Sequence, residues 1–315
     1  LTYNMNFNKI DKLQNGKTLY GSGWASASLM PGNDYILREG APVGVIRGYK
    51  SDGFYTVDDF NYVNGVYTLK EGVPDIQSNV FTNYPKPAEI QVPAGQSAFP
   101  GALKIKDTHK DGIINEEDVV ELGNVMAHHT GGFGFSGNYK NFDFSANFTY
   151  QIGGKVYNAS AMCEYTGGKE PGIGKNKRDF IRDCFQLYDV RNGELVVVTD
   201  PTELAALNRN ATRPVPYYEA NTVLSDFIED ASFLRLSNLT IGYSFPKTLL
   251  KKAYIQSARV YVTGGNLFCI TGYSGLDPEV STNGAAGNSG YPTPGLDYGS
   301  YPRSRTFTVG LNLTF

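Results

Sequence analysis

The sequence predicts an all-β chain: a segment of an antiparallel transmembrane β-barrel, with about six strands and long extracellular loops. Three observations predict this class. Apolar and polar side chains alternate over segments of about ten residues, the polar faces of these segments carry Ser, Thr, Asn and Gly in place of Lys and Glu, and short and long connections follow one another in turn.

The segment at residues 141–150 shows the alternation most clearly. Its apolar face consists of Phe142, Phe144, Ala146, Phe148 and Tyr150. The opposite face consists of Asp143, Ser145, Asn147 and Thr149. Strands of about ten residues are longer than those of most soluble sheets and match a tilted bilayer crossing. A soluble sandwich also has one apolar and one polar face per strand, so it stays an alternative.

Two later segments repeat the pattern. In the first, Leu239, Ile241, Tyr243 and Phe245 alternate with Asn238, Thr240, Gly242 and Ser244. In the second, Phe307, Val309, Leu311, Leu313 and Phe315 alternate with Thr306, Thr308, Gly310, Asn312 and Thr314. The chain therefore finishes on an aromatic residue that completes a predicted strand.

The connections differ in length in a regular way. Only Tyr139-Lys-Asn141 joins the strands expected at 131–139 and 142–152, and a short basic turn at 246–256 joins the next pair. Between these lie long connections at about 11–130, 153–231 and 268–303. A barrel with short turns on the periplasmic rim and long loops outside requires this order. The long loops also contain a predicted short helix at 175–188, with Phe180, Cys184 and Leu187 at helical spacing.

Composition excludes several classes of protein. The 315 residues include 36 Gly, 22 Tyr and 18 Phe, only 19% are charged, and the net charge is -3. So many aromatic residues argue against disorder, and the slight negative charge argues against a nucleic-acid partner. No apolar run is long enough for a transmembrane helix.

Two further expectations concern the first residues and the cysteines. The sequence opens at Leu1 in strand alternation without a signal peptide, so either a leader was removed or the sequence is a piece of a longer chain. Cys163 and Cys184 fall in one long loop and are expected to form a disulfide if the compartment is oxidising. The alternative is that both are small buried apolar residues.

The run Asp107–Asp118 is spaced like a calcium-binding loop. Asp107, Asp111, the Ile113 carbonyl and Asp118 occupy ligand positions, and Gly112 supplies the turn. His109 stands at the third position, although imidazole is a poor ligand for Ca²⁺. We predict Ca²⁺ as the one cofactor, with a metal-free loop held by Asx turns as the alternative.

Signals for catalysis are weak. The adjacent His128 and His129 would point to opposite faces of a strand, and the sequence matches none of the hydrolase, metalloprotease or P-loop motifs. We therefore expect a protein that is not an enzyme. Aromatic residues in the long loops are the candidates for binding ligand by stacking, although interface or loop packing is the simpler explanation for any one of them. These candidates are Tyr217, Tyr218, Tyr273, Tyr291 and Tyr298.

Several separated stretches together resemble the C-terminal part of the SusC/RagA family of TonB-dependent outer-membrane transporters. In the family's order they are Glu39–Gly44, Gly48–Gly53, Asp107–Asp118 followed by Gly123, Asp230–Pro246, Arg259–Leu267, Tyr273–Glu279 and Tyr301–Phe315. They span nearly the whole chain. His109 departs from the family, which commonly has Asn there, and this weakens the calcium prediction.

The resemblance implies that residues 1–315 form the C-terminal portion of a 22-stranded barrel, whose N-terminal plug and TonB box are absent from this chain. Residues 1–10 and 301–315 would then pair with the missing strands. The implied function is energy-coupled import of oligosaccharides, or of peptides, across the bacterial outer membrane. The implied partners are a SusD-like surface lipoprotein that contacts the long loops, the rest of the same transporter, the TonB complex acting through the plug, and outer-membrane lipid. Two alternatives remain: a small passive outer-membrane barrel, and a secreted calcium-binding β-sandwich that binds glycans.

Overall fold

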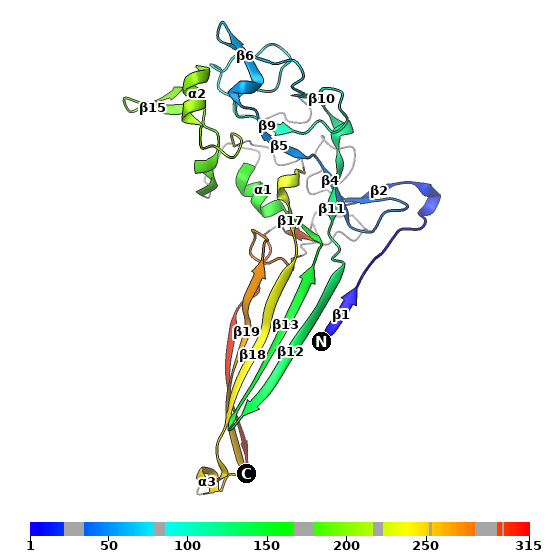
Figure 1. Ribbon diagram of the computed structural model, residues 1–315, viewed down its shortest axis with the longest axis vertical. Helices are drawn as coiled ribbons and strands as arrows, with labels where there is room; N and C mark the ends of the chain where they lie inside the picture. The colour runs from blue at the N-terminus through cyan, green and yellow to red at the C-terminus, as the bar shows by residue number, and fades with distance from the viewer. Residues whose placement is uncertain are drawn as a thin grey trace.

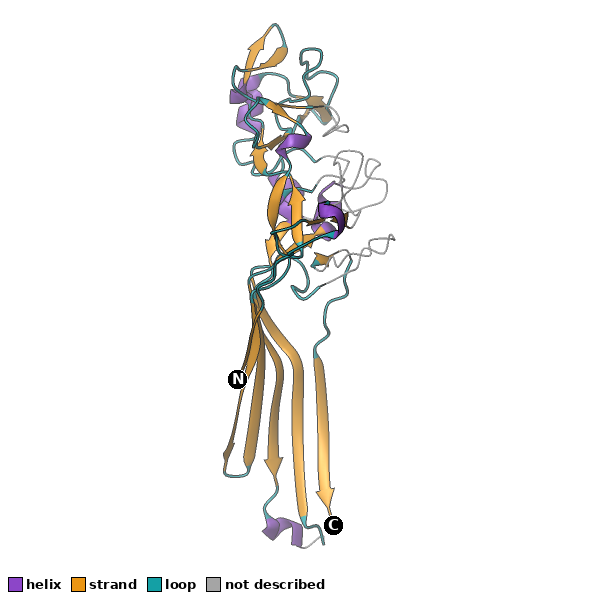
Figure 2. Cartoon of the chain, turned by 90° about the vertical axis from the view of Figure 1, so that its right-hand side faces the viewer, coloured by secondary structure: helices purple, strands orange, loops and turns teal. Residues whose placement is uncertain are grey.

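The computed structural model describes residues 1–21, 35–77, 86–166, 179–216, 223–251, 254–280, 295–297 and 299–315. The chain has two regions, a long sheet and a compact region of loops and short elements beyond one end of the sheet (Figure 1). We call these the wall and the loop region. Helices lie in the loop region except α3, which lies at the opposite end of the wall (Figure 2).

The wall is an antiparallel sheet of six strands in the order β1-β12-β13-β18-β19-β21. Their bounds are β1 Thr2–Met5, β12 His129–Tyr139, β13 Phe142–Ile152, β18 Phe233–Ser244, β19 Ser257–Thr271 and β21 Thr306–Thr314. Each strand pairs with the next wall strand along the chain, which is the up-and-down order predicted from the sequence. Because β1 and β21 each pair with one neighbour only, the sheet is not closed into a barrel.

The connections alternate as the sequence predicted. Two residues join β12 to β13, with Lys140 at a φ of 55° in the turn, and α3 (Lys247–Leu250) lies between β18 and β19. The other wall connections are long and make up the loop region. Two register shifts, both next to Ser237, interrupt the pairing of β18 with β13 and with β19.

The predicted apolar face is confirmed and extends across the sheet. Phe144 pairs with Ile241, Ile241 with Val262, and Val262 with Val309, so one row of apolar side chains crosses four strands. These side chains are exposed; Phe307 and Val309 each retain 72% of their accessible area. An apolar face this exposed fits contact with lipid chains rather than with water.

The opposite face is polar, but it is not free of charge as the sequence suggested. Asp143 and Arg259 lie on it as an ion pair, with Arg259 Nε donating to Asp143 Oδ2 at 2.9 Å. Arg235 on β18 also belongs to this face and is buried. The sequence pattern identified the faces correctly and missed that charges on the polar face neutralise each other across strands.

Over the described residues, the short strands of the loop region form six small sheets. The largest has the order β11-β4-β3-β2, a second β17-β14-β20, and the remaining four are the pairs β5-β9, β6-β7, β10-β8 and β15-β16. The strand bounds are β2 Leu19–Gly21, β3 Tyr35–Leu37, β4 Val45–Gly48, β5 Ser51–Phe54, β6 Phe60–Val63, β7 Val66–Leu69, β8 Asp75–Ile76, β9 Leu103–Ile105, β10 Ile113–Ile114, β11 Val120–Asn124, β14 Lys155–Asn158, β15 Tyr188–Arg191, β16 Glu194–Val197, β17 Ile228–Asp230 and β20 Leu296–Asp297.

Short helices complete the loop region. The α-helices are α1 Ala159–Thr166 and α2 Pro201–Leu207, and the 3-10 turns are η1 Gln14–Gly16, η2 Val57–Asp59, η3 Glu116–Asp118, η4 Asp179–Asp183 and η5 Ser225–Phe227. In place of the helix predicted at 175–188, the described residues form the turn η4 followed by the start of β15. Cys184 and Leu187 are buried there without a helix, so their spacing reflected packing.

The loop region has its own hydrophobic core. The core draws on residues from Tyr35 to Leu296, including the fully buried Tyr49, Tyr55 and Tyr67, and within the described part none of its members lies on a wall strand. The long connections are therefore a folded body. Among the described residues, no helix has the length and apolar content needed to cross a bilayer.

Candidate functional site

The polar face of the wall is the first candidate surface for contact with a solute. Hydroxyl groups on it hydrogen bond across strands: Thr149 Oγ1 lies 2.9 Å from Ser237 Oγ, and Thr240 Oγ1 lies 2.9 Å from Thr263 Oγ1. Such neutral donors and acceptors interact with hydroxylated or amide solutes without imposing a large charge.

A buried charged network lies on this face near the loop region. Arg235 donates from Nη2 to Asp277 Oδ1 at 2.6 Å and from Nη1 to Asn266 Oδ1 at 2.5 Å, and its Nε lies 3.0 Å from Glu279 Oε2. Glu279 Oε2 also lies 3.2 Å from Arg303 Nη1. Burial of a guanidinium is stabilising only when such partners surround it.

The network joins three separate parts of the chain. Arg235 comes from β18, Asp277 and Glu279 follow β19, and Arg303 precedes β21. Asn266, at a φ of 52° in β19, also donates from Nδ2 to the Arg303 carbonyl at 2.9 Å. The network therefore holds both ends of the last long loop against the wall. Sequence analysis missed it because strict alternation puts Arg235 on the same face as Leu239 and Ile241, and only the register shift next to Ser237 turns it to the polar face.

Tyr273, a predicted ligand-stacking residue, is buried in the segment that follows β19. Its ring packs with Val156 and Ala231, and its hydroxyl donates to Asp297 Oδ2 at 2.6 Å. Burial and the neighbouring Asp297 carboxylate raise the pKa of the Tyr273 hydroxyl above its ordinary value. These contacts serve to hold β20 and the segment after β19 together.

The acidic loop at 107–118 has an internal hydrogen-bond pattern. The buried Asp118 accepts from the Thr108 and His109 N–H groups at 2.7 and 3.0 Å and from the Asn115 N–H at 2.9 Å. Asp107 accepts from the N–H groups of Lys110 and Gly112. Desolvation raises the pKa of Asp107, but these N–H groups outweigh it and hold the pKa below its usual value. The carboxylates thus shape the loop as Asx turns do.

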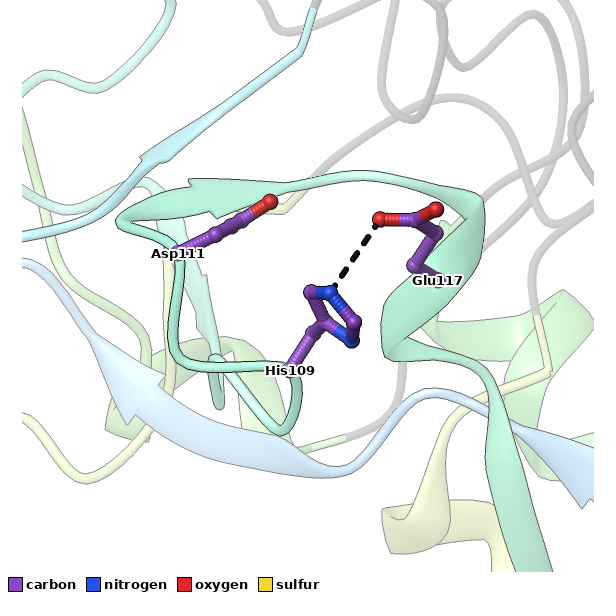
Figure 3. A group of neighbouring side chains, drawn as sticks. All are labelled: His109, Asp111 and Glu117. Carbon is purple, nitrogen blue, oxygen red and sulfur yellow. Dashed lines mark ion pairs between the residues drawn. The ribbon is translucent and has the colours of Figure 1, made fainter.

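The predicted carboxylate ligands all contact the loop backbone: Asp107, Asp111 and Asp118 each accept a hydrogen bond from a backbone N–H. Asp111 and His109 also lie with Glu117, which the sequence did not single out, and the ligand atoms of these three residues are within 4.8 Å of one another (Figure 3). His109 Nε2 lies 3.5 Å from Glu117 Oε2, and all three side chains are exposed. The trio includes His109, the predicted third ligand, whose imidazole is a poor ligand for Ca²⁺. The calcium site stays a prediction.

Several of the other predicted site residues are not among the residues that the structure describes. Tyr217, Tyr218, Tyr291 and Tyr298 lie outside the described residues. The Cys163 side chain is also outside them, while Cys184 is buried and its Sγ donates to the Phe180 carbonyl at 3.4 Å. The disulfide therefore stays a prediction as well.

Comparison with known proteins gives consistent relatives. Over 313 residues, 99% of this chain, the sequence is 30% identical to TonB-dependent receptor P3 of Formosa agariphila. It is 31% identical over 220 residues to TonB-dependent receptor P26 of the same organism, and 43% identical over 90 residues, 28% of this chain, to TonB-dependent receptor SusC of Bacteroides thetaiotaomicron. The chain spans 26%, 20% and 8% of these relatives, respectively. No protein-family profile matches it.

Solved structures agree on the fold. The chain is similar to the RagAB peptide importer in its closed-closed state, with a TM-score of 0.60, 20% identity and coverage of 99% of this chain and 26% of that one. A second RagAB peptide transporter structure gives a TM-score of 0.59 with the same identity and coverage.

Proposed function

Because this chain belongs to the SusC/RagA-like TonB-dependent receptors and spans 26% of TonB-dependent receptor P3, we propose that it forms part of the barrel wall and the extracellular loops of an outer-membrane nutrient importer. The observation that carries the proposal is the wall itself: long strands with an exposed apolar face on one side and a polar face on the other. In a membrane the apolar face contacts lipid and the polar face lines the lumen.

We place residues 1–315 at the C-terminal portion of the barrel. The two edge strands, β1 and β21, would complete their hydrogen bonds with strands from the N-terminal part of the same transporter, since open sheet edges are not tolerated in lipid. The plug and the TonB box would belong to that other part, so the TonB complex would act on this chain only through the plug.

The loop region would contact a SusD-like surface lipoprotein and the ligand. This contact is supported by the hydrophobic core of the loop region, because loops that pack on a core present a defined surface to a partner. We propose an oligosaccharide or a peptide as the cargo, since the polar wall offers mainly neutral donors and acceptors. The relatives are named as receptors and transporters, which agrees with a protein that is not an enzyme.

The loop at 107–118 is proposed to bind Ca²⁺ through carboxylates of Asp107, Asp111 and Asp118. Each accepts hydrogen bonds from the loop backbone, so they are already oriented within one turn. Calorimetric titration with Ca²⁺ tests this: D111N should weaken the binding, and E117Q should not. Absence of any Ca²⁺ heat in the unsubstituted protein would leave the metal-free loop as the answer.

Neither alternative explains the structure as well. Within the described residues, no second sheet covers the apolar face of the wall, as a soluble sandwich requires. A small passive barrel requires the wall strands to close on themselves, and β1 does not pair with β21.

The experiment that tests the function is uptake by cells in which the full-length gene is deleted and then restored. Accumulation of labelled oligosaccharides and of labelled peptides is measured separately, with and without an uncoupler of the proton-motive force. Energy-dependent loss of one class of cargo on deletion supports the proposal and identifies that class. Uptake that survives the uncoupler would favour the passive channel, and uptake of both classes unaffected by deletion would refute import.

A further inference from the structure

The end of the wall that carries the short connections is positively charged. These connections, residues 140–141 and 245–256, contain four lysines and no Asp or Glu. The chain as a whole has a net charge of -3. The positive charge is therefore concentrated at this end, which we call the basic rim.

The two connections of the basic rim are neighbours in space. The Ser244 N–H donates to the Asn141 carbonyl at 2.8 Å, and the rings of Phe142 and Tyr243 lie with centroids 4.8 Å apart. The Gln256 N–H donates to the Thr314 carbonyl at 2.8 Å, which ties the second connection to the last wall strand. Its helix α3 projects beyond the strands (Figures 1 and 2).

The lysine charges of the basic rim are not neutralised by protein. Lys140, Lys247 and Lys251 are exposed, and within the part of the chain that the structure describes none of them forms an ion pair. The contrast with the polar face is clear, since the nearby Arg259 is paired with Asp143 there. The fourth lysine, Lys252, lies outside the described residues.

Exposed apolar side chains stand beside these lysines. Leu249 and Tyr254 keep 64% and 91% of their accessible area in the connection that follows β18. Phe245, at the start of this connection, packs on Tyr243 of the apolar face with ring centroids 5.3 Å apart. Cations next to apolar and aromatic side chains match the boundary between acyl chains and phosphate headgroups, where the apolar parts insert and the ammonium groups reach the phosphates.

We propose that the basic rim binds the headgroups of anionic phospholipids in the adjoining leaflet, through Lys140, Lys247 and Lys251. The inference rests on the proposed placement of the wall in the outer membrane. A lipid occupant is favoured over a soluble protein because the rim is continuous with the lipid-facing apolar face and carries the charge opposite to that of the phosphates.

The test uses the full-length transporter, reconstituted in bilayers that contain both phosphatidylglycerol and phosphatidylcholine. Mass spectrometry measures the ratio of the two lipids retained after exchange into neutral detergent. A lysine near an anionic surface contributes roughly a fivefold preference, so loss of three additive contributions in K140Q/K247Q/K251Q should lower the phosphatidylglycerol preference about a hundredfold. The matched control K50Q/K106Q/K110Q removes three exposed lysines of the loop region and should leave the ratio unchanged.

Three results would overturn the inference: an unchanged ratio in the rim variant, an equal fall in the control, or displacement of phosphatidylglycerol by inorganic phosphate alone. Failure of the proposed function has a different signature. If the wall is not embedded in the bilayer, neither lipid is retained by any variant, whereas failure of the inference alone leaves both lipids bound without preference.

Discussion

At the scale of single residues, Arg235 shows how a charge is accommodated on the wall. Its guanidinium is 3% exposed and its partner Asp277 is equally buried. Two opposite charges that are both removed from water compensate each other. Loss of one therefore leaves the other buried without a compensating charge. Removal of Arg235 therefore destabilises the protein mainly because Asp277 stays buried without a cation.

Replacing Arg235 with Met should destabilise the protein by about 3 kcal/mol or more, because Asp277 would stay buried without a cation. The measurement is the free energy of unfolding of the full-length transporter in denaturant. Arg38→Ala is the matched control: Arg38 and Glu121 form a pair at 2.7 Å, but both are exposed, so its loss should cost about 1 kcal/mol or less. Equal costs for the two variants would contradict this account of the network.

A glycine in the loop region gives a second residue-scale prediction. Gly101 has a φ of +90°, and a Cβ there would collide with Phe185 and lie 2.7 Å from Val215 Cγ2. Gly95 has the same φ, but its Cβ would meet no atom within 4 Å. Gly95→Ala thus reports only the backbone strain, roughly 1–2 kcal/mol, and Gly101→Ala adds overpacking of roughly 1–3 kcal/mol.

Limited proteolysis of the loop region measures this difference, since cleavage follows local opening. Gly101→Ala should be cut faster than Gly95→Ala, and both faster than the unsubstituted protein. Identical rates for the two variants would mean that the core around Phe185 tolerates the added methyl group.

At the scale of elements, the faces of the wall strands can be read from the sequence. Successive side chains of a strand point to opposite faces, and in a membrane strand one face contacts lipid and the other contacts water. In β21, Val309 faces the apolar side and its neighbour Thr308 faces the polar side. The register confirms this, since Val309 pairs with Val262 and Thr308 with Thr263. Elements of the loop region do not follow so simple a rule, because their faces are covered by other loops.

Val309→Lys should therefore destabilise the inserted protein by roughly 2–4 kcal/mol if Val309 lies near the middle of the bilayer. Thr308→Lys adds the same charge one residue away, on the polar face, and should cost much less. Unfolding from lipid vesicles, followed by heat-modifiable gel mobility, compares the two. A larger effect of Thr308→Lys would reverse the assignment of the faces.

At the scale of the whole molecule, the two edges of the wall determine whether the sheet is stable in a bilayer. The N–H and C=O groups on the outer sides of β1 and β21 have no strand beside them within the described chain, and unsatisfied backbone groups cost several kcal/mol each in lipid. A six-stranded sheet is thus unsuited to stand alone in a bilayer.

The 315-residue chain refolded alone into vesicles should consequently remain aggregated and show no heat-modifiable band. Refolding it together with the remaining part of the transporter should restore the band, because β1 and β21 then gain partners. A monomeric, protease-resistant, inserted form of the chain alone would contradict the open-edge account and favour a small independent barrel.

The sequence by itself determined the wall: its strands, their order, the two faces and the alternation of short and long connections. These are local properties, since alternation along one strand follows directly from which solvent each face contacts. Only the tertiary structure decided the rest. The Arg235 network joins residues up to 68 positions apart, the loop core gathers short strands from three connections, and Glu117 joins His109 and Asp111 through a turn. Such contacts depend on how distant segments pack, and no period in the sequence records them.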